Sequence, residues 1–184
     1  MRMAGAGNDL TRSGTKNTGA HNVYGHLGGG WAAGVGLADT GKGAAAATIG
    51  RFIGGDAGCY AAATASVLGH VFPVGRRGGK GVATSWGLCL IVFPIYAPVD
   101  LLVAAGLAWY RRQAPAGART RPAVLIASAA FVGAAALWSC RRLPNPGGPR
   151  PGPGLVAYGL ITSAALASRW LPARTSPTPI EPAA

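Results

Sequence analysis

The chain has 184 residues, the length of a single domain, and a formal net charge of +12 from 17 Lys and Arg against 5 Asp and Glu. That balance suits a nucleic-acid-binding protein, yet only 12% of the residues are charged and the mean hydropathy is +0.29. The basic residues lie between apolar blocks, as in integral membrane proteins. Composition therefore argues against a soluble nucleic-acid-binding domain.

The first 28 residues are polar and rich in glycine, without the apolar core of a cleavable signal. We expect a loop there, because glycine, asparagine and serine punctuate the whole stretch.

Two apolar blocks follow at residues 29–49 and 52–68, with Arg51 marking a short turn between them. Asp39 and Lys42 interrupt the first block, and charges are costly at membrane depth unless they pair or face a polar cavity. Their spacing of three residues suits an ion pair on one helix.

A basic, glycine-rich loop joins the second block to the next one. It carries Arg76, Arg77 and Lys80 among glycines, and a helix start follows Gly81. Glycines that allow a close backbone approach, cations and free helix N–H groups together describe a phosphate cradle. The loop is equally consistent with a basic turn that anchors two membrane helices at the cytoplasmic face.

The rest of the chain contains three more apolar stretches. Residues 82–110 are too long for one membrane span and contain Pro94 and Pro98, so we expect two short helices that meet there. Residues 122–140 form a clean apolar block with Pro122 at its start. A proline- and glycine-rich linker at 141–154 precedes the last short block at 155–167.

These blocks predict an all-α protein: a polytopic transmembrane bundle of about six short helices, rich in alanine and glycine, with glycine-rich functional loops. We expect one membrane domain over residues 1–170 and a proline-rich, disordered tail at 171–184. Cys59, Cys89 and Cys140 are isolated and lack the spacing of a metal site, so no metal is expected.

Three stretches of sequence carry a family resemblance. The first is H-V-F-P-V at 70–74 followed by G-G-K-G-V-A-T at 78–84. The second is D-L at 9–10 with G-T-K-N-T-G-A-H-N-V at 14–23, and the third is D-T-G-K-G at 39–43. In order and spacing they resemble the motifs of the bacterial acyl-phosphate:glycerol-3-phosphate acyltransferases, a family of small polytopic membrane enzymes.

The chain also departs from the family pattern. Thr15 stands in place of a serine, Lys16 in place of a glycine and Gly25 in place of an arginine. The third family motif has two candidate remnants, Arg141-Arg142 with Asn145 or Arg169-Trp170, and the sequence does not decide between them. The membrane helix that precedes the first motif in the family is expected to be absent here.

The resemblance implies transfer of a fatty acyl group from acyl-phosphate to the sn-1 hydroxyl of glycerol 3-phosphate, which gives lysophosphatidic acid for phospholipid synthesis. Acyl-phosphate is already activated, so no cofactor is implied. The alternative is a diverged, non-catalytic membrane homologue that serves as a scaffold or partner. The implied partners are the two substrates and membrane lipid, with no nucleic acid; a homo-oligomer or pairing with another membrane protein is left open. The implied location is the bacterial cell membrane, crossed several times, with the motif loops on the cytoplasmic side.

The resemblance also implies roles for individual residues. Those expected in catalysis are His70, Thr15 and Lys80. Those expected to bind substrate phosphate are Lys16, Asn17, Gly19, Asn22, Gly78, Gly79 and Gly81, with Asp39, Lys42, Arg76 and Arg77 in support. His70 is expected to act as a base or to orient a phosphate. If the motif is disregarded, the alternative interpretation is that His70 is a hydrogen-bonded cap at the membrane interface. Asn17 and Asn22 would then be ordinary turn residues.

Overall fold

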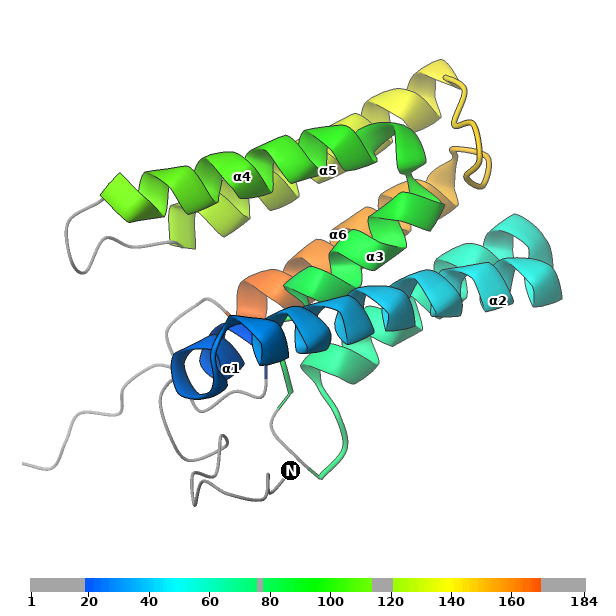
Figure 1. Cartoon of the computed structure of the whole chain (residues 1–184). Helices are drawn as coiled ribbons and strands as arrows, with labels where there is room; N and C mark the ends of the chain where they lie inside the picture. Colours follow the sequence, from blue (N-terminus) through cyan, green and yellow to red (C-terminus); the bar gives the residue numbers. More distant parts are fainter. Residues whose placement is uncertain (1–18, 76–77, 114–120, 170–184) are drawn as a thin grey trace, which may run out of the picture.

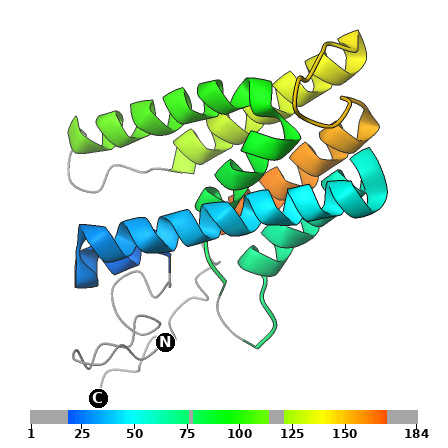
Figure 2. The same cartoon turned by 45° about the vertical axis from the view of Figure 1, so that its right-hand side comes forward.

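The computed structural model describes residues 19–75, 78–113 and 121–169. In these residues every regular element is helical, which confirms the predicted all-α fold. The elements are α1 (Ala20–Leu27), α2 (Gly29–Val71), α3 (Val82–Val92), the 3-10 helix η1 (Pro94–Tyr96), α4 (Ala97–Gln113), α5 (Arg121–Arg141) and α6 (Pro153–Ser168). Two views show three layers, with α4 and α5 on one side of α3 and α6, and α2 on the other side (Figures 1 and 2).

Helix α2 reverses direction part of the way along and forms two arms that lie side by side (Figure 1). The reversal is at Gly54 and Gly55, whose backbone is not helical, and Gly55 has a φ of 58° that favours glycine. The two arms touch near the turn, where a Cβ on Gly50 or Gly58 would collide with the other's carbonyl group. The turn expected at Arg51 is therefore wrong by a few residues, because Arg51 is helical and the left-handed glycine sets the reversal.

Helix α3 packs closely across the first arm of α2, and glycines make the close approach possible. A Cβ on Gly87 would collide with the carbonyl oxygen of Thr40, and one on Gly43 with that of Thr84. The Thr40 hydroxyl also donates a hydrogen bond to the carbonyl of Ala83 across 3.3 Å. Small residues at both faces therefore bring the two backbones together, as in many membrane helix pairs.

This packing makes a stability prediction. Gly87→Ala should destabilise the protein by about 1–3 kcal/mol, because the added methyl group must push α3 away from α2. Gly41→Ala is the matched control, since a Cβ at Gly41 meets no atom within 4 Å. Thermal unfolding in detergent micelles should show a clear loss for Gly87→Ala and none for Gly41→Ala. Equal midpoints for the two variants would contradict the packing.

The long block at 82–110 divides as expected. Helix α3 ends at Val92, Pro94 opens η1, and the chain turns by 120° between 82–92 and 94–103. The bend is filled by Phe93, which stacks on Tyr96 at 5.4 Å and meets Trp138 edge-on at 5.6 Å. An aromatic core thus fixes the corner between α3, α4 and α5.

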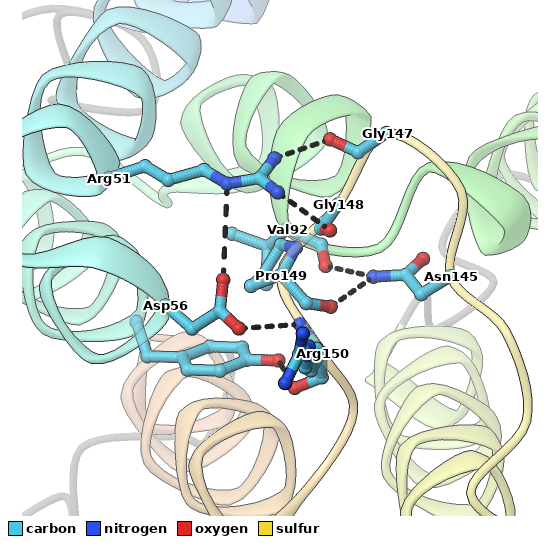
Figure 3. Close-up of polar contacts among 9 residues, drawn as sticks. Arg51, Asp56, Val92, Asn145, Gly147, Gly148, Pro149 and Arg150 are labelled. Atoms are coloured by element: carbon cyan, nitrogen blue, oxygen red, sulfur yellow. Dashed lines mark hydrogen bonds and ion pairs between the residues drawn. The ribbon is translucent and has the colours of Figure 1, made fainter.

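The linker between α5 and α6 is tied to the reversal of α2 and to the C-terminal end of α3 (Figure 3). Arg51 donates to the carbonyls of Gly147 at 2.6 Å and Gly148 at 3.0 Å. The Asp56 carboxylate accepts the Arg150 backbone N–H at 3.0 Å. Asn145 donates to the carbonyl of Val92 at 3.0 Å. We call these contacts the linker clasp; they fix α6 relative to α2 and α3.

The outer surface is apolar. Among the described residues one helix segment, Val124–Arg141, is long and apolar enough to cross a membrane, and a second qualifies if the bent α3–α4 pair is one span. Only 6% of the Val124–Arg141 window is buried, so this segment is not the core helix of a soluble protein. Large apolar side chains also face outward on the other helices, among them Leu37, Phe52, Ile53 and Leu102. Such a surface is that of a helical membrane protein.

One expectation about the N-terminal segment is wrong. Residues 20–27 form α1 instead of a loop: the Gly19 carbonyl accepts the N–H groups of Asn22 and Val23, and the Val23 side chain is buried. Helix α1 packs on the first arm of α2, where Ala20 lies against Gly36. The packing of Ala20 and Val23 against the rest of the protein outweighed the turn-forming residues, as tertiary packing often does for short helices.

Candidate active site

Three segments that are distant in sequence meet around His70. His70 lies in the last turn of α2, two residues after the apolar block ends at Leu68. Lys42, from the other arm, places its Nζ 2.8 Å from His70 Nδ1 and 3.0 Å from Asp39 Oδ1. The Thr84 hydroxyl, near the start of α3, lies 3.2 Å from the same His70 nitrogen. The reversal of α2 and the close α2–α3 packing create this cluster.

The surroundings favour the neutral form of His70. Burial lowers the pKa of His70 below its usual value of 6.5, Lys42 and Arg169 lower it further, and Asp39 opposes them. A neutral imidazole also fits the geometry, because the Lys42 ammonium can only donate and Nδ1 must then accept. His70 is thus uncharged near neutral pH and able to take up a proton.

These causes predict opposite shifts for two substitutions. Asp39→Asn removes the group that raises the His70 pKa, so that pKa should fall further, whereas Lys42→Met should raise it. NMR titration of histidine-labelled protein, with His26 as an internal reference, measures both changes. Shifts of the same sign in the two variants would contradict this electrostatic account.

The glycine loop, residues 78–81, lies directly against His70. The Gly79 N–H donates to the His70 carbonyl at 3.0 Å, and a Cβ on Gly79 would collide with the imidazole Nε2. Gly78 is packed in the same way against the carbonyl of Val71. Gly81 has a φ of 78° and caps the N-terminus of α3. These positions require glycine, and the imidazole contact depends on it.

Arg169 joins the site from the end of α6. Its Nη2 donates to the carbonyl of Gly78 at 2.6 Å, and its Nε lies 3.4 Å from that of Gly79. Asn145, from the other candidate remnant of the third motif, belongs to the linker clasp at the opposite ends of α3 and α6. Of the two candidates, only Arg169 contacts the glycine loop in the part of the chain that the structure describes.

The structure brings together part of the residues that the sequence predicted. His70, Asp39, Lys42, Gly78 and Gly79 form one cluster. Gly81 caps α3 beside it, and Lys80 lies half-buried between these glycines. Asn22 is buried on α1 and Gly19 caps that helix. Five predicted residues lie outside the described residues: Thr15, Lys16, Asn17, Arg76 and Arg77.

Two residues were not predicted as part of the site, Thr84 and Arg169. Thr84 is the last residue of the glycine-rich motif at 78–84, so the motif could have predicted it as a site residue. Arg169 is 90 residues or more from the loop carbonyls that it contacts, and only the family pattern pointed to it.

The cluster combines the groups that a transfer reaction on an anionic substrate requires. A neutral imidazole can accept a proton from a hydroxyl group, and the Lys42 ammonium can neutralise a phosphate. The loop adds backbone N–H groups beside a helix start, where negative charge is stabilised. Among the described residues no group of three or more His, Cys, Asp or Glu side chains is placed to hold a metal ion.

Comparisons with known proteins point to one family. The glycerol-3-phosphate acyltransferase family profile matches residues 2–170. A glycerol-3-phosphate acyltransferase of Syntrophomonas wolfei is 35% identical over 114 residues, 61% of this chain and 58% of that protein. One of Sinorhizobium fredii is 40% identical over 126 residues, 67% of this chain and 61% of that protein. The chain thus spans somewhat more than half the length of these curated relatives.

Solved structures show the same fold. The crystal structure of PlsY (YgiH), an integral membrane glycerol 3-phosphate acyltransferase, in its glycerol 3-phosphate form has a TM-score of 0.71 and 28% identity, covering 89% of this chain and 75% of that one. Its lysophosphatidic acid form has a TM-score of 0.66 and 26% identity, covering 84% and 72%. With motifs, fold and family profile in agreement, the chain belongs to the glycerol-3-phosphate acyltransferase family.

Proposed function

We propose that this chain transfers a fatty acyl group from acyl-phosphate to the sn-1 hydroxyl of glycerol 3-phosphate, giving lysophosphatidic acid and inorganic phosphate. The observation that carries the proposal is the contact of Lys42 with a neutral His70 that lies against the glycine loop. Family membership supports glycerol 3-phosphate as the acceptor, since the relatives are named glycerol-3-phosphate acyltransferases.

In this proposal His70 is the base. The substrate phosphate draws Lys42 away from His70 Nδ1, and the freed lone pair accepts the hydroxyl proton. The hydroxyl oxygen then bonds to the acyl carbon, the bond from that carbon to the phosphate oxygen breaks, and phosphate leaves with the bonding electrons. Loop N–H groups other than that of Gly79, which donates to the His70 carbonyl, stabilise the negative charge that develops on the carbonyl oxygen.

The remaining predicted residues take supporting roles. Lys80, Arg76 and Arg77 are proposed to attract the two phosphate groups, which carry most of the substrates' charge. Thr15, Lys16, Asn17, Gly19 and Asn22 are proposed to bind glycerol 3-phosphate from the first motif. Arg169 is proposed as a positioning residue, because its guanidinium group holds the carbonyls of Gly78 and Gly79 and so fixes the backbone of the glycine loop.

The chain is further proposed to cross the membrane several times, with the glycine loop on the cytoplasmic side. The two arms of α2 return the chain to the side on which α2 began (Figure 1). The loop segment contains Arg76, Arg77 and Lys80, and such basic segments favour the cytoplasmic side.

A donor comparison tests the proposal. Purified full-length protein is supplied with glycerol 3-phosphate and either palmitoyl-phosphate or palmitoyl-CoA, and lysophosphatidic acid is measured by mass spectrometry. We expect product from palmitoyl-phosphate alone. Product from palmitoyl-CoA would overturn the proposed donor, and no product from either would favour the non-catalytic homologue.

A further inference from the structure

The end of the bundle opposite the glycine loop carries three exposed arginines, Arg141, Arg142 and Arg150. Arg141 and Arg142 close α5, Arg150 lies in the linker, and all three side chains are exposed. In the part of the chain that the structure describes, no side chain or carbonyl pairs with their guanidinium groups. The Asp56 carboxylate of the linker clasp accepts the backbone N–H of Arg150, but its ion pair is with the guanidinium group of Arg51, at 3.9 Å.

Arg142 occupies a backbone position that favours glycine. Its φ is 50°, and it is the one non-glycine residue with a positive φ among the described residues. This left-handed residue ends α5, so that the Leu143 N–H donates to the Trp138 carbonyl at 3.0 Å. Glycine would close the helix with less strain. The retention of a strained arginine at an exposed helix end suggests that its side chain has a functional role.

Large apolar side chains lie at the same end. Phe52 and Ile53 are 88% and 84% exposed at the α2 turn, next to Arg51. Arg51 binds the linker carbonyls of Gly147 and Gly148, so the turn and the linker are joined (Figure 3). Exposed apolar groups beside cations are typical of protein surfaces at the boundary between lipid headgroups and acyl chains.

We propose that Arg141, Arg142 and Arg150, here called the arginine end, bind the headgroup phosphate of anionic phospholipids in the surrounding membrane, with Phe52 and Ile53 in the adjacent acyl region. Guanidinium groups suit phosphate because their planar N–H donors match its oxygens. This lipid site lies at the opposite ends of α3 and α6 from the glycine loop and does not depend on acyl transfer.

Lipid binding to the full chain tests the proposal. Native mass spectrometry measures how tightly detergent-purified protein binds phosphatidylglycerol relative to phosphatidylcholine. The wild type should prefer phosphatidylglycerol, and Arg142→Gly should weaken that preference about fivefold, the usual worth of one arginine near an anionic surface. The triple variant R141Q/R142G/R150Q should lose most of the preference. Inorganic phosphate at the same concentration should not displace the lipid, which separates a lipid site from a site for the free anion.

The matched control is Arg112→Gln, in the last turn of α4, because α4 begins beside the end of α3 and runs away from the arginine end (Figure 1). It removes one charge and should leave the preference unchanged. Arg142→Gly should also keep or raise the thermal midpoint in phosphatidylcholine, since the backbone strain is relieved. An undiminished preference in the triple variant, or an equal loss in Arg112→Gln, would overturn the proposal.

Discussion

Replacing His70 with alanine is expected to lower kcat/KM for acyl transfer by about two to four factors of ten, the usual contribution of a positioned base. His70 is the group that Lys42, Thr84 and the glycine loop surround. Initial rates with palmitoyl-phosphate and glycerol 3-phosphate measure the effect. Removal of the imidazole leaves a small cavity at the helix end, so the amount of folded protein should change little.

His26→Ala is the matched control for this substitution. His26 lies on α1 and its Nδ1 is 2.9 Å from the Asn22 carbonyl of its own helix. Its loss removes a histidine and a local hydrogen bond without touching the His70 cluster. If both variants kept the wild-type rate, or lost it equally, the assignment of His70 as the base would be wrong.

Gly79→Ala is expected to have the second large effect, a loss of at least about tenfold in kcat. The new Cβ would collide with His70 Nε2, so either the imidazole or the loop must move. Displacement of a catalytic group by about 1 Å commonly costs two factors of ten in rate. KM should change less, because the substitution removes none of the cationic side chains that bind the substrate phosphates.

Gly69→Ala separates this effect from a general intolerance of glycine replacement. Gly69 precedes His70 in the same helix, and a Cβ there meets no atom within 4 Å. Its activity should equal that of the wild type, and its stability should rise slightly because alanine favours the helix. Equal loss of activity in both variants would show that the contact of Gly79 with the imidazole is not what matters.

The helical fold was predictable because its main signals are local. Pro94 and Pro98 predicted the break between α3 and α4, and Pro122 predicted the start of α5, since proline lacks the N–H that a helix interior needs. The reversal of α2 was predictable only roughly. Gly54 and Gly55 were visible in the sequence, but the charged Arg51 was the more conspicuous interruption, and its role in the linker clasp depends on residues about a hundred positions away.

The site was predicted where a motif names its residues and missed where distant parts meet. His70, Gly78 and Gly79 belong to one continuous stretch, and Asp39 and Lys42 carry their own short pattern. Their meeting depends on the reversal of α2, and the approach of Thr84 depends on Gly43 and Gly87. Arg169 reaches the loop because the linker clasp and α6 carry it back across the bundle. No local pattern encodes such contacts.

The most direct test of the proposed reaction is the release of inorganic phosphate from palmitoyl-phosphate by the purified chain, with and without glycerol 3-phosphate. We expect release from the wild type only when glycerol 3-phosphate is present, and a loss of that release in His70→Ala. Phosphate release that does not depend on glycerol 3-phosphate, or that is unchanged by His70→Ala, would contradict acyl transfer at this site.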